Sequence, residues 1–334
     1  MTAVLNSLIA MIPFVLLLFP AERTAGSFDP ADRNVTNRCR GFFALVVILH
    51  HMAQRCSDRG LLIMYYDIGY LPVAMFFFYT GYGLLKKGIG QKQNYFRRRL
   101  PSVAIPYIQT MVIYWILYAL AGDVKSPASL MLEHLNNASG ISFLWYVFVY
   151  VFWILFLGAG LKFMKKDVQI LFAAGLFACL FVTLFVMTAP GLFWIYDTVL
   201  MIPLGCAWAY REQEITGMIR RHYSAVLSVS FLLFVLSLIR PAGMVIRIIG
   251  YSFSAVMFMI FLNTALMKQR PCGKAISFLG TVSYEIYLLH GIPVTFLRSV
   301  IASEALWTLS VLVIAVLSAW CLHEVNLRTW NKKR

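Results

Sequence analysis

Long apolar runs recur along almost the whole chain, and each is about 17 to 25 residues long. A helix of that length crosses a hydrocarbon core roughly 30 Å thick. Hydrophobic residues make up 60% of the chain and charged residues only 13%, which is too little charge to cover a soluble domain. The shorter alternating segments of a membrane barrel are absent. The sequence therefore predicts an all-α, polytopic bundle of membrane-spanning helices.

We place eleven spans along the chain. They lie near residues 4–20, 39–54, 62–85, 101–121, 142–161, 168–188, 192–210, 223–240, 244–266, 276–297 and 303–322. The first run resembles a signal peptide, but no Lys or Arg precedes it and it is rather long. We therefore expect residues 1–38 to form an extra N-terminal span with a cytoplasmic linker, and residues 39–334 to form the main membrane domain.

The basic residues predict the orientation, because Lys and Arg near the ends of spans are retained on the cytoplasmic side. Most of the 29 Lys and Arg fall in alternate segments of this topology. Those segments are 23–40, 86–99, 162–166, 211–221, 268–274 and 328–334. We therefore expect a multi-pass protein of the cell membrane, with its amino terminus outside and its carboxyl terminus in the cytoplasm.

The polar residues also exclude two classes of partner. The formal net charge of +15 is explained by short basic clusters between spans, so no nucleic-acid binding is predicted. The six cysteines form no C-x-x-C pair and no metal-ligand spacing with histidine. Neither a disulfide framework nor a metal site is expected.

The second span carries the first candidate site residues. Eleven positions, almost three helical turns, separate Arg40 from His51, so both lie on one face about 16 Å apart. Ala44 and Val47 between them are small, which leaves room for a slender chain held at its anionic end by Arg40. His51 is either a buried histidine satisfied by a neighbour or a functional group, and the cost of ionisable residues inside a bilayer favours function. His50 is expected to pack.

A basic run follows the third span. Arg97, Arg98 and Arg99 lie on the same predicted membrane face as Arg40. A purely topological role in anchoring the span is one interpretation. Their position beside Arg40 favours the other, in which they bind the phosphates of a nucleotide cofactor.

Glu285 is a carboxylate within a predicted span and needs a partner. One hypothesis pairs it with His51, which would fix the imidazole in one tautomer and stabilise its charged form. The other pairs it with a Lys or Arg from a cytoplasmic loop. Ser283, Tyr287 and His290 share a helical face and are candidates for the donor or acceptor path.

Five separated signals together resemble the acyltransferase 3 family of integral membrane acyltransferases. They are Arg40-x10-His51, the Phe-Phe-Phe-Tyr-Thr-Gly-Tyr-Gly stretch at 76–83, Arg97-Arg98-Arg99, Leu144-Trp145-Tyr146, and Ser283-Tyr284-Glu285-Ile286-Tyr287-Leu288-Leu289-His290. The resemblance covers about residues 38–323 and depends on the combination, because each signal alone is weak. Small Gly81 and Gly83 in the second signal favour close helix approach, expected towards the His-bearing span.

The resemblance implies a core of ten spans that moves acyl groups, commonly acetyl, from coenzyme A to carbohydrates or other envelope molecules outside. It also implies that His51 is catalytic, that Arg40 belongs to the same motif and that the basic run contacts the acyl donor. Thr80 stands where the family usually has Ser, which keeps the hydroxyl. The extra first span departs from the family pattern.

The sequence thus predicts an acyltransferase that uses acyl-CoA, most simply acetyl-CoA, as co-substrate and an extracytoplasmic hydroxyl as acceptor. His51 serves as general base or as a transient acyl carrier. The remaining assignments are Glu285 as a catalytic partner, Arg40, Arg97, Arg98 and Arg99 for the donor, and Thr80, Trp145, Tyr284 and His290 along the substrate path. For Trp145, stacking on a sugar and membership of the interfacial aromatic belt both stay open.

A transporter or flippase is the alternative function. The many spans and the intramembrane Glu285, His51 and His290 could support a proton relay. Such a protein typically has repeated halves, whereas the His-bearing and Arg-rich signals occur once, near the amino end.

Overall fold

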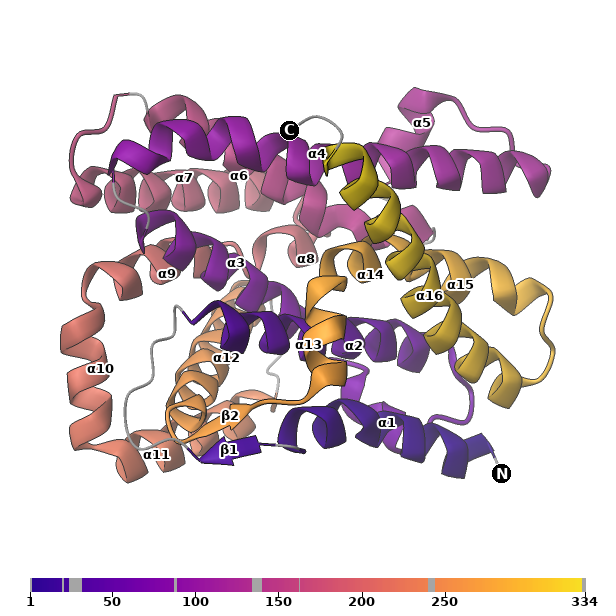
Figure 1. The fold of residues 1–334 in the computed structure, drawn as a ribbon, viewed down its shortest axis with the longest axis horizontal. Coiled ribbons are helices and arrows are strands. Elements are labelled where there is room, and N and C mark those ends of the chain that lie inside the picture. Colours follow the sequence, from indigo (N-terminus) through magenta and orange to yellow (C-terminus); the bar gives the residue numbers. More distant parts are fainter. Residues whose placement is uncertain are drawn as a thin grey trace.

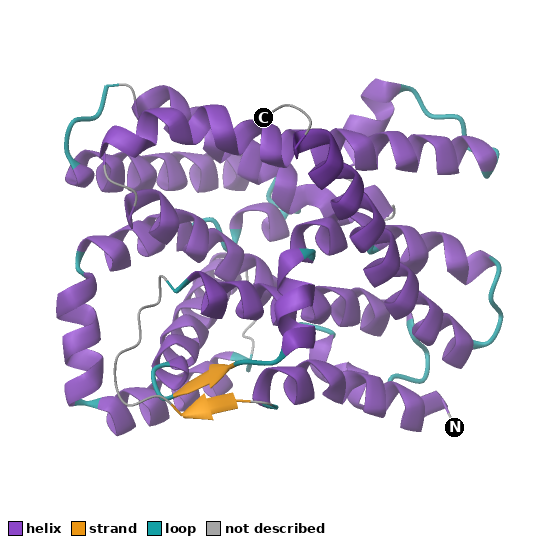
Figure 2. Ribbon diagram, viewed as in Figure 1, coloured by secondary structure: helices purple, strands orange, loops and turns teal. Residues whose placement is uncertain are grey.

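The computed structural model describes residues 2–19, 21–23, 32–86, 89–133, 140–161, 163–239 and 244–331. Helices make up nearly all of this part of the chain, beside one short two-stranded ribbon (Figure 2). Five of the described helices are long and apolar enough to cross a membrane, and the bent pair Glu212–Arg221 and Tyr223–Ser237 gives a sixth if it forms one span. The chain is therefore an all-α membrane protein, as predicted, while the count of eleven spans stays a prediction.

Figure 1 labels the elements in chain order. They are α1 (Thr2–Leu18), β1 (Ala21–Arg23), α2 (Arg33–Arg55), η1 (Gly60–Tyr65), α3 (Tyr70–Lys86), α4 (Ile89–Leu120), α5 (Pro127–Leu132), η3 (Gly140–Leu144), α6 (Trp145–Leu161), α7 (Asp167–Thr188), α8 (Phe193–Tyr196), α9 (Met201–Tyr210), α10 (Glu212–Arg221), α11 (Tyr223–Ser237), α12 (Met244–Leu266), β2 (Gln269–Pro271), α13 (Lys274–Thr281), α14 (Ser283–Leu289), α15 (Gly291–Phe296), η4 (Leu297–Ser299) and α16 (Glu304–Asn331). In Figure 1, α4, α6 and α7 run along one edge, α1, β1 and α11 lie along the opposite one, and α2 lies between these edges. β1 pairs antiparallel with β2, which ties the segment after α1 to the segment before α13.

Three predicted spans are not single helices. The segment 62–85 divides into η1 and α3, the segment 192–210 into α8 and α9, and the segment 276–297 into α13, α14 and α15. In each case a helix restarts just before a proline, because Pro72, Pro203 and Pro293 are each the third residue of their helix. Proline lacks the backbone N–H and is tolerated in the first turn, where that donor has no helical partner. The interruptions in 62–85 and 192–210 leave loops beside the site described below.

Close helix crossings depend on glycine. A methyl group at Gly81 of α3 would overlap the backbone of α9, and one at Gly205 of α9 would overlap the backbone of α3. The His-bearing helix α2 instead crosses α13, where Gly41 meets Gly280 in the same way. The expectation that Gly81 and Gly83 approach the His-bearing span was therefore wrong: Gly81 packs against α9, and nothing lies within 4 Å of a methyl group placed on Gly83. Sequence spacing gave the small residues but not their partner helix.

Gly81 and Gly83 form a matched pair for testing this crossing. Gly81→Ala is expected to lower the free energy of unfolding by about 1–3 kcal/mol, because the added methyl forces the two backbones apart. Gly83→Ala adds the same methyl in open space and gains about 0.5–1 kcal/mol of helix propensity. Thermal unfolding of the purified protein in detergent measures both, and equal midpoints for the two variants would contradict the crossing.

The first helix is docked on the loop that follows α2. Asn6 donates from Nδ2 to the carbonyl of Asp58 over 2.6 Å, and Ser7 Oγ accepts from the backbone N–H of Leu61 over 3.0 Å. The Tyr65 hydroxyl donates to the carbonyl of Ala10 over 2.6 Å. α1 therefore holds η1, and η1 leads directly into the loop that enters the site.

Candidate active site

Two pockets meet at Tyr287, which among the described residues is the one that lines both. The first, called here the histidine pocket, is lined by Val47, His50, His51, Gln54, Tyr66, Asp67, Gly69, Tyr70, Val73, Ser142, Phe143, Trp145, Phe193, Trp194, Asp197, Tyr251 and Tyr287. The second, called the arginine pocket, is lined by Asn37, Arg40, Phe76, Thr80, Arg99, Ser102, Val103, Tyr146, Tyr150, Gly280, Thr281, Ser283, Tyr284, Glu285 and Tyr287. Helix α2 contributes Arg40 to one pocket and His51 to the other.

The predicted shared face of α2 is therefore divided in space. Arg40 and His51 lie on one helix as expected, but they line different pockets; of the two small residues between them, Val47 lines the histidine pocket and the fully buried Ala44 lines neither. The ring of Tyr287 separates the two pockets, and its hydroxyl donates to the carbonyl of Phe143 over 2.5 Å. Tyr287 is therefore the described residue at which the two pockets meet.

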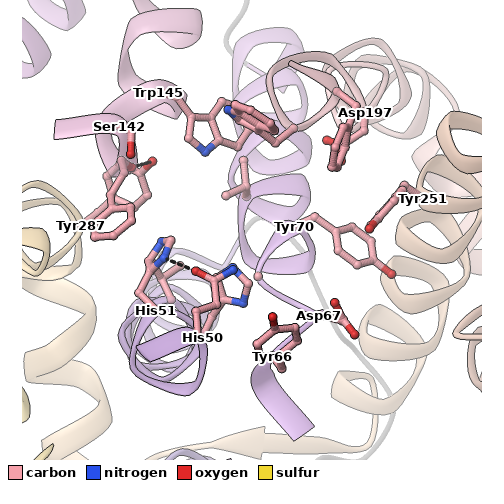
Figure 3. A pocket seen from close by; sticks show the side chains of 17 residues that line it. His50, His51, Tyr66, Asp67, Tyr70, Ser142, Trp145, Asp197, Tyr251 and Tyr287 are labelled. Atoms are coloured by element: carbon pink, nitrogen blue, oxygen red, sulfur yellow. Dashed lines mark hydrogen bonds between the residues drawn. The ribbon is translucent and has the colours of Figure 1, made fainter. Parts of the chain in front are cut away.

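The histidine pocket is lined mainly by aromatic rings and also contains two carboxylates, Asp67 and Asp197 (Figure 3). Rings of Phe, Tyr and Trp reach it from seven elements or loops, as Tyr66, Tyr70, Phe143, Trp145, Phe193, Trp194, Tyr251 and Tyr287. In Figure 3, Asp67 and Asp197 lie on the side away from His51 and Tyr287. Aromatic faces with a few polar groups are typical of a pocket that orients a partly polar organic molecule.

The ring of His51 packs against two other rings, Phe143 and His290, which also stack on each other at a centroid distance of 5.7 Å. Phe143 stacks on His51 at a centroid distance of 3.9 Å, and His290 stacks at 5.2 Å. The His290 Nδ1 lies 2.7 Å from the carbonyl of Tyr287, so its Nδ1–H donates to its own helix. His290 thus packs against the candidate base and does not line either pocket.

A short set of hydrogen bonds continues from His51 along α2. His51 Nδ1 lies 3.1 Å from Gln54 Oε1, the contact dashed in Figure 3. Gln54 Nε2 lies 3.1 Å from His50 Nε2, and His50 Nδ1 lies 2.8 Å from the carbonyl of Tyr65. His50, expected only to pack, therefore connects η1 to the candidate base.

The arginine pocket brings together basic side chains from two helices. Arg40 comes from α2 and Arg99 from α4. The Nε of Arg99 donates to the Tyr150 hydroxyl over 2.8 Å. Thr80 and Tyr284 line the same pocket. Arg97 and Arg98 lie on the backbone of α4, but their side chains fall outside the described residues. Two guanidinium groups in one pocket form a site for anionic oxygens.

Glu285 does not contact His51, so the expected pairing was wrong. Its Oε1 lies 2.9 Å from His323 Nδ1 on α16, a partner that neither hypothesis considered. Glu285 is in the first turn of α14 and lines the arginine pocket, whereas His51 lies on the other side of Tyr287. The position of Tyr287 two residues later explains the separation, because successive residues of a helix point in different directions.

Sequence reasoning missed Gln54 and underestimated His50. Gln54 stands four residues after His50 and three after His51, and helix neighbours at these spacings face each other. This spacing could have identified it. The role of Tyr287 as the wall between two pockets depends on contacts from η3 and α6, which no local pattern contains.

A stacked imidazole in an aromatic pocket, next to a pocket with two arginines and within a helical membrane bundle, is typical of an integral membrane enzyme. The family model described as an acyltransferase domain matches residues 37–324. The chain therefore belongs to the acyltransferase 3 family, as its motifs predicted, and is a membrane acyltransferase. No curated protein and no solved structure matches the chain. Helix α1 lies outside the matched range.

Proposed function

We propose that this protein transfers an acyl group, most simply acetyl, from cytosolic acyl-CoA to a hydroxyl of an envelope carbohydrate or a similar acceptor outside the membrane. The observation that carries the proposal is the pair of pockets that meet at Tyr287, one containing Arg40 and Arg99 and the other containing His51. A donor with an anionic end and a slender arm suits the first pocket. An acceptor that combines apolar faces with hydroxyls suits the second.

Donor binding begins at the arginine pocket. Arg40 and Arg99 donate hydrogen bonds to the phosphates of the coenzyme, and the sequence favours Arg97 and Arg98, which directly precede Arg99, as further donor ligands. Thr80 and Tyr284 line the path of the arm. The thioester then meets the acceptor where Tyr287 divides the pockets, so a movement of this ring accompanies donor entry.

The chemistry is assigned to His51. Its unprotonated nitrogen removes the proton of the acceptor hydroxyl, and the hydroxyl oxygen attacks the thioester carbonyl to form a tetrahedral oxyanion. The intermediate collapses with cleavage of the carbon–sulfur bond, and the thiolate takes the proton from the imidazolium. The ester and free coenzyme A are the products. A transient acyl-His51 intermediate is the second route, because imidazole also acts as a nucleophile.

The proposed membrane topology serves this reaction. Eleven spans with the amino terminus outside put the basic segments, and with them the arginine pocket, towards the cytoplasm. The histidine pocket then opens towards the outer side of the cell membrane. Trp145 lines this pocket, which favours contact with the acceptor over a place in the interfacial belt.

Release of the free coenzyme A thiol tests the function. Membranes containing the protein are expected to release thiol from acetyl-CoA at a rate that rises when crude envelope glycans are supplied as acceptor. A transporter lacks this acceptor-dependent cleavage. If neither acetyl-CoA nor longer acyl-CoA donors release thiol with any glycan, lipid or small-molecule hydroxyl acceptor, the acyl-CoA proposal is wrong.

A further inference from the structure

The hydrogen bonds that link His50, Gln54 and His51 on α2 start at the backbone carbonyl of Tyr65, which can only accept. The carbonyl of Tyr65 has no proton to give, so the contact of 2.8 Å requires that His50 donates from Nδ1. The rings of His50 and His51 lie with centroids only 4.8 Å apart, and two imidazolium ions at that distance repel each other. His50 is therefore neutral when His51 is protonated in the reaction, and its Nε2 carries a lone pair.

That lone pair fixes the orientation of Gln54. The Nε2 of His50 now accepts, so the group 3.1 Å away must be the amide N–H of Gln54 and not its carbonyl. The carbonyl of Gln54 consequently points to His51, whose Nδ1 lies 3.1 Å from it. Because this carbonyl only accepts, His51 donates from Nδ1–H.

We propose that Gln54 is a positioning residue that holds neutral His51 in the tautomer protonated at Nδ1, so that Nε2 is the atom that removes the acceptor's proton. This inference rests on the proposed function, in which His51 is the base, and it names the basic atom and the side chain that selects it. The series of hydrogen bonds runs from the Tyr65 carbonyl through His50 and Gln54 to His51, and each bond determines which atom of the next group donates and which accepts. Gln54 takes the part that the sequence had assigned to Glu285.

The same series of hydrogen bonds explains what Gln54 does during the reaction. When Nε2 gains the proton, His51 becomes a cation, and a hydrogen bond from a charged donor to the Gln54 carbonyl is stronger than one from a neutral donor. The stabilisation is thus largest at the step where the hydroxyl loses its proton. Gln54 is exposed to the pocket, so water competes for its amide and the effect is moderate.

The surroundings keep His50 in its place. A methyl group at Gly69 would overlap the ring of His50, so only glycine leaves room for the ring in this position. Tyr65 is held from the other side by the hydrogen bond of its hydroxyl to Ala10 in α1. Helix α1, which lies outside the family match, thereby helps to fix Tyr65, whose carbonyl is the first acceptor in this series of hydrogen bonds.

Nitrogen-15 NMR of histidine-labelled protein in lipid nanodiscs tests the proposal without using activity. Protonated and unprotonated imidazole nitrogens have well separated shifts, and the signal of His51 among the six histidines is the one absent from His51→Ala. Wild-type His51 is expected to be protonated at Nδ1 only. Gln54→Leu is expected to show a mixture of both tautomers, and Gln54→Glu, which still accepts from Nδ1–H, is expected to restore the single form.

Kinetics gives the second readout. Gln54→Leu is expected to lower kcat about tenfold with the KM for acyl-CoA unchanged, as for other groups that orient a reacting imidazole. Gln54→Glu is expected to recover most of this loss. Gly69→Ala, which displaces His50 without removing a polar group, is expected to resemble Gln54→Leu in both readouts.

The outcomes separate the two proposals. His51 protonated at Nε2 in the wild type, or a single Nδ1–H tautomer that persists in both Gln54→Leu and Gly69→Ala, would overturn the positioning role even if acyl transfer is observed. A tautomer that depends on Gln54 in a protein that cleaves no acyl-CoA would sustain the tautomer control and reject the proposed reaction.

Discussion

Replacing His51 with alanine is expected to lower the kcat of acyl transfer by on the order of a thousandfold, because general base catalysis contributes about 10²–10⁴-fold. The removed imidazole lines the histidine pocket, where the acceptor is proposed to bind, and it packs against Phe143 and His290. The arginine pocket lies on the other side of Tyr287, so the affinity for acyl-CoA is expected to stay within a few fold of the wild type. Thiol release at saturating acceptor measures kcat, and binding of a non-hydrolysable donor analogue measures affinity.

His222 provides the matched control for this variant. It lies between α10 and α11 and lines neither pocket, so His222→Ala removes one imidazole without touching the site. We expect His222→Ala to retain the wild-type rate. Equal thiol release by wild type and His51→Ala, with acceptor present, would remove His51 as the base.

The arrangement of α2 could be predicted from the sequence because it is local. A helical period puts Arg40 and His51 on one face, and it also puts Gln54 next to both His50 and His51. The first relation was predicted and the second was overlooked. Both follow from 3.6 residues per turn without knowledge of any other helix.

The division between the pockets could not be predicted in this way. Tyr287 separates them because its ring meets Tyr146 of α6 at a centroid distance of 5.4 Å and its hydroxyl meets the carbonyl of Phe143. These contacts join segments more than a hundred residues apart, and their geometry depends on how the helices pack. The predicted partner of Glu285 was wrong for the same reason, because its actual partner, His323, lies on the distant helix α16.

The interrupted spans show a third kind of limit. Hydropathy alone predicts one span for 276–297, although Pro293 was visible in the sequence. Averaging over a window hides the position of a proline, whereas the backbone responds to that position. Two similar breaks, in the segments 62–85 and 192–210, contribute to the histidine pocket, because the loops at 66–69 and at 197 supply Tyr66, Asp67 and Asp197 to its lining.

Arg40→Ala is expected to raise the KM for acyl-CoA by about 10- to 100-fold while changing kcat much less. The side chain is half-buried in the arginine pocket, and a hydrogen bond to a charged group contributes about 1.5–3 kcal/mol, where 1.4 kcal/mol corresponds to a factor of ten in affinity. Arg40→Lys keeps the charge but loses the planar guanidinium that binds two phosphate oxygens. Its KM for acyl-CoA is therefore expected to lie between those of the wild type and Arg40→Ala. Initial rates of thiol release at varied acetyl-CoA give both constants.

Arg33 is the control for the loss of charge alone. It is on the same helix, is exposed and lines neither pocket, so Arg33→Ala removes one positive charge from the same helix without removing a proposed phosphate ligand. If long-range attraction of the anionic donor were the main effect, the two alanine variants would raise KM alike. A large rise for Arg40→Ala alone would support direct contact with the donor. A wild-type KM with a lowered kcat for Arg40→Ala would instead place the residue outside donor binding, and the assignment of the two pockets to donor and acceptor would have to be reversed or abandoned.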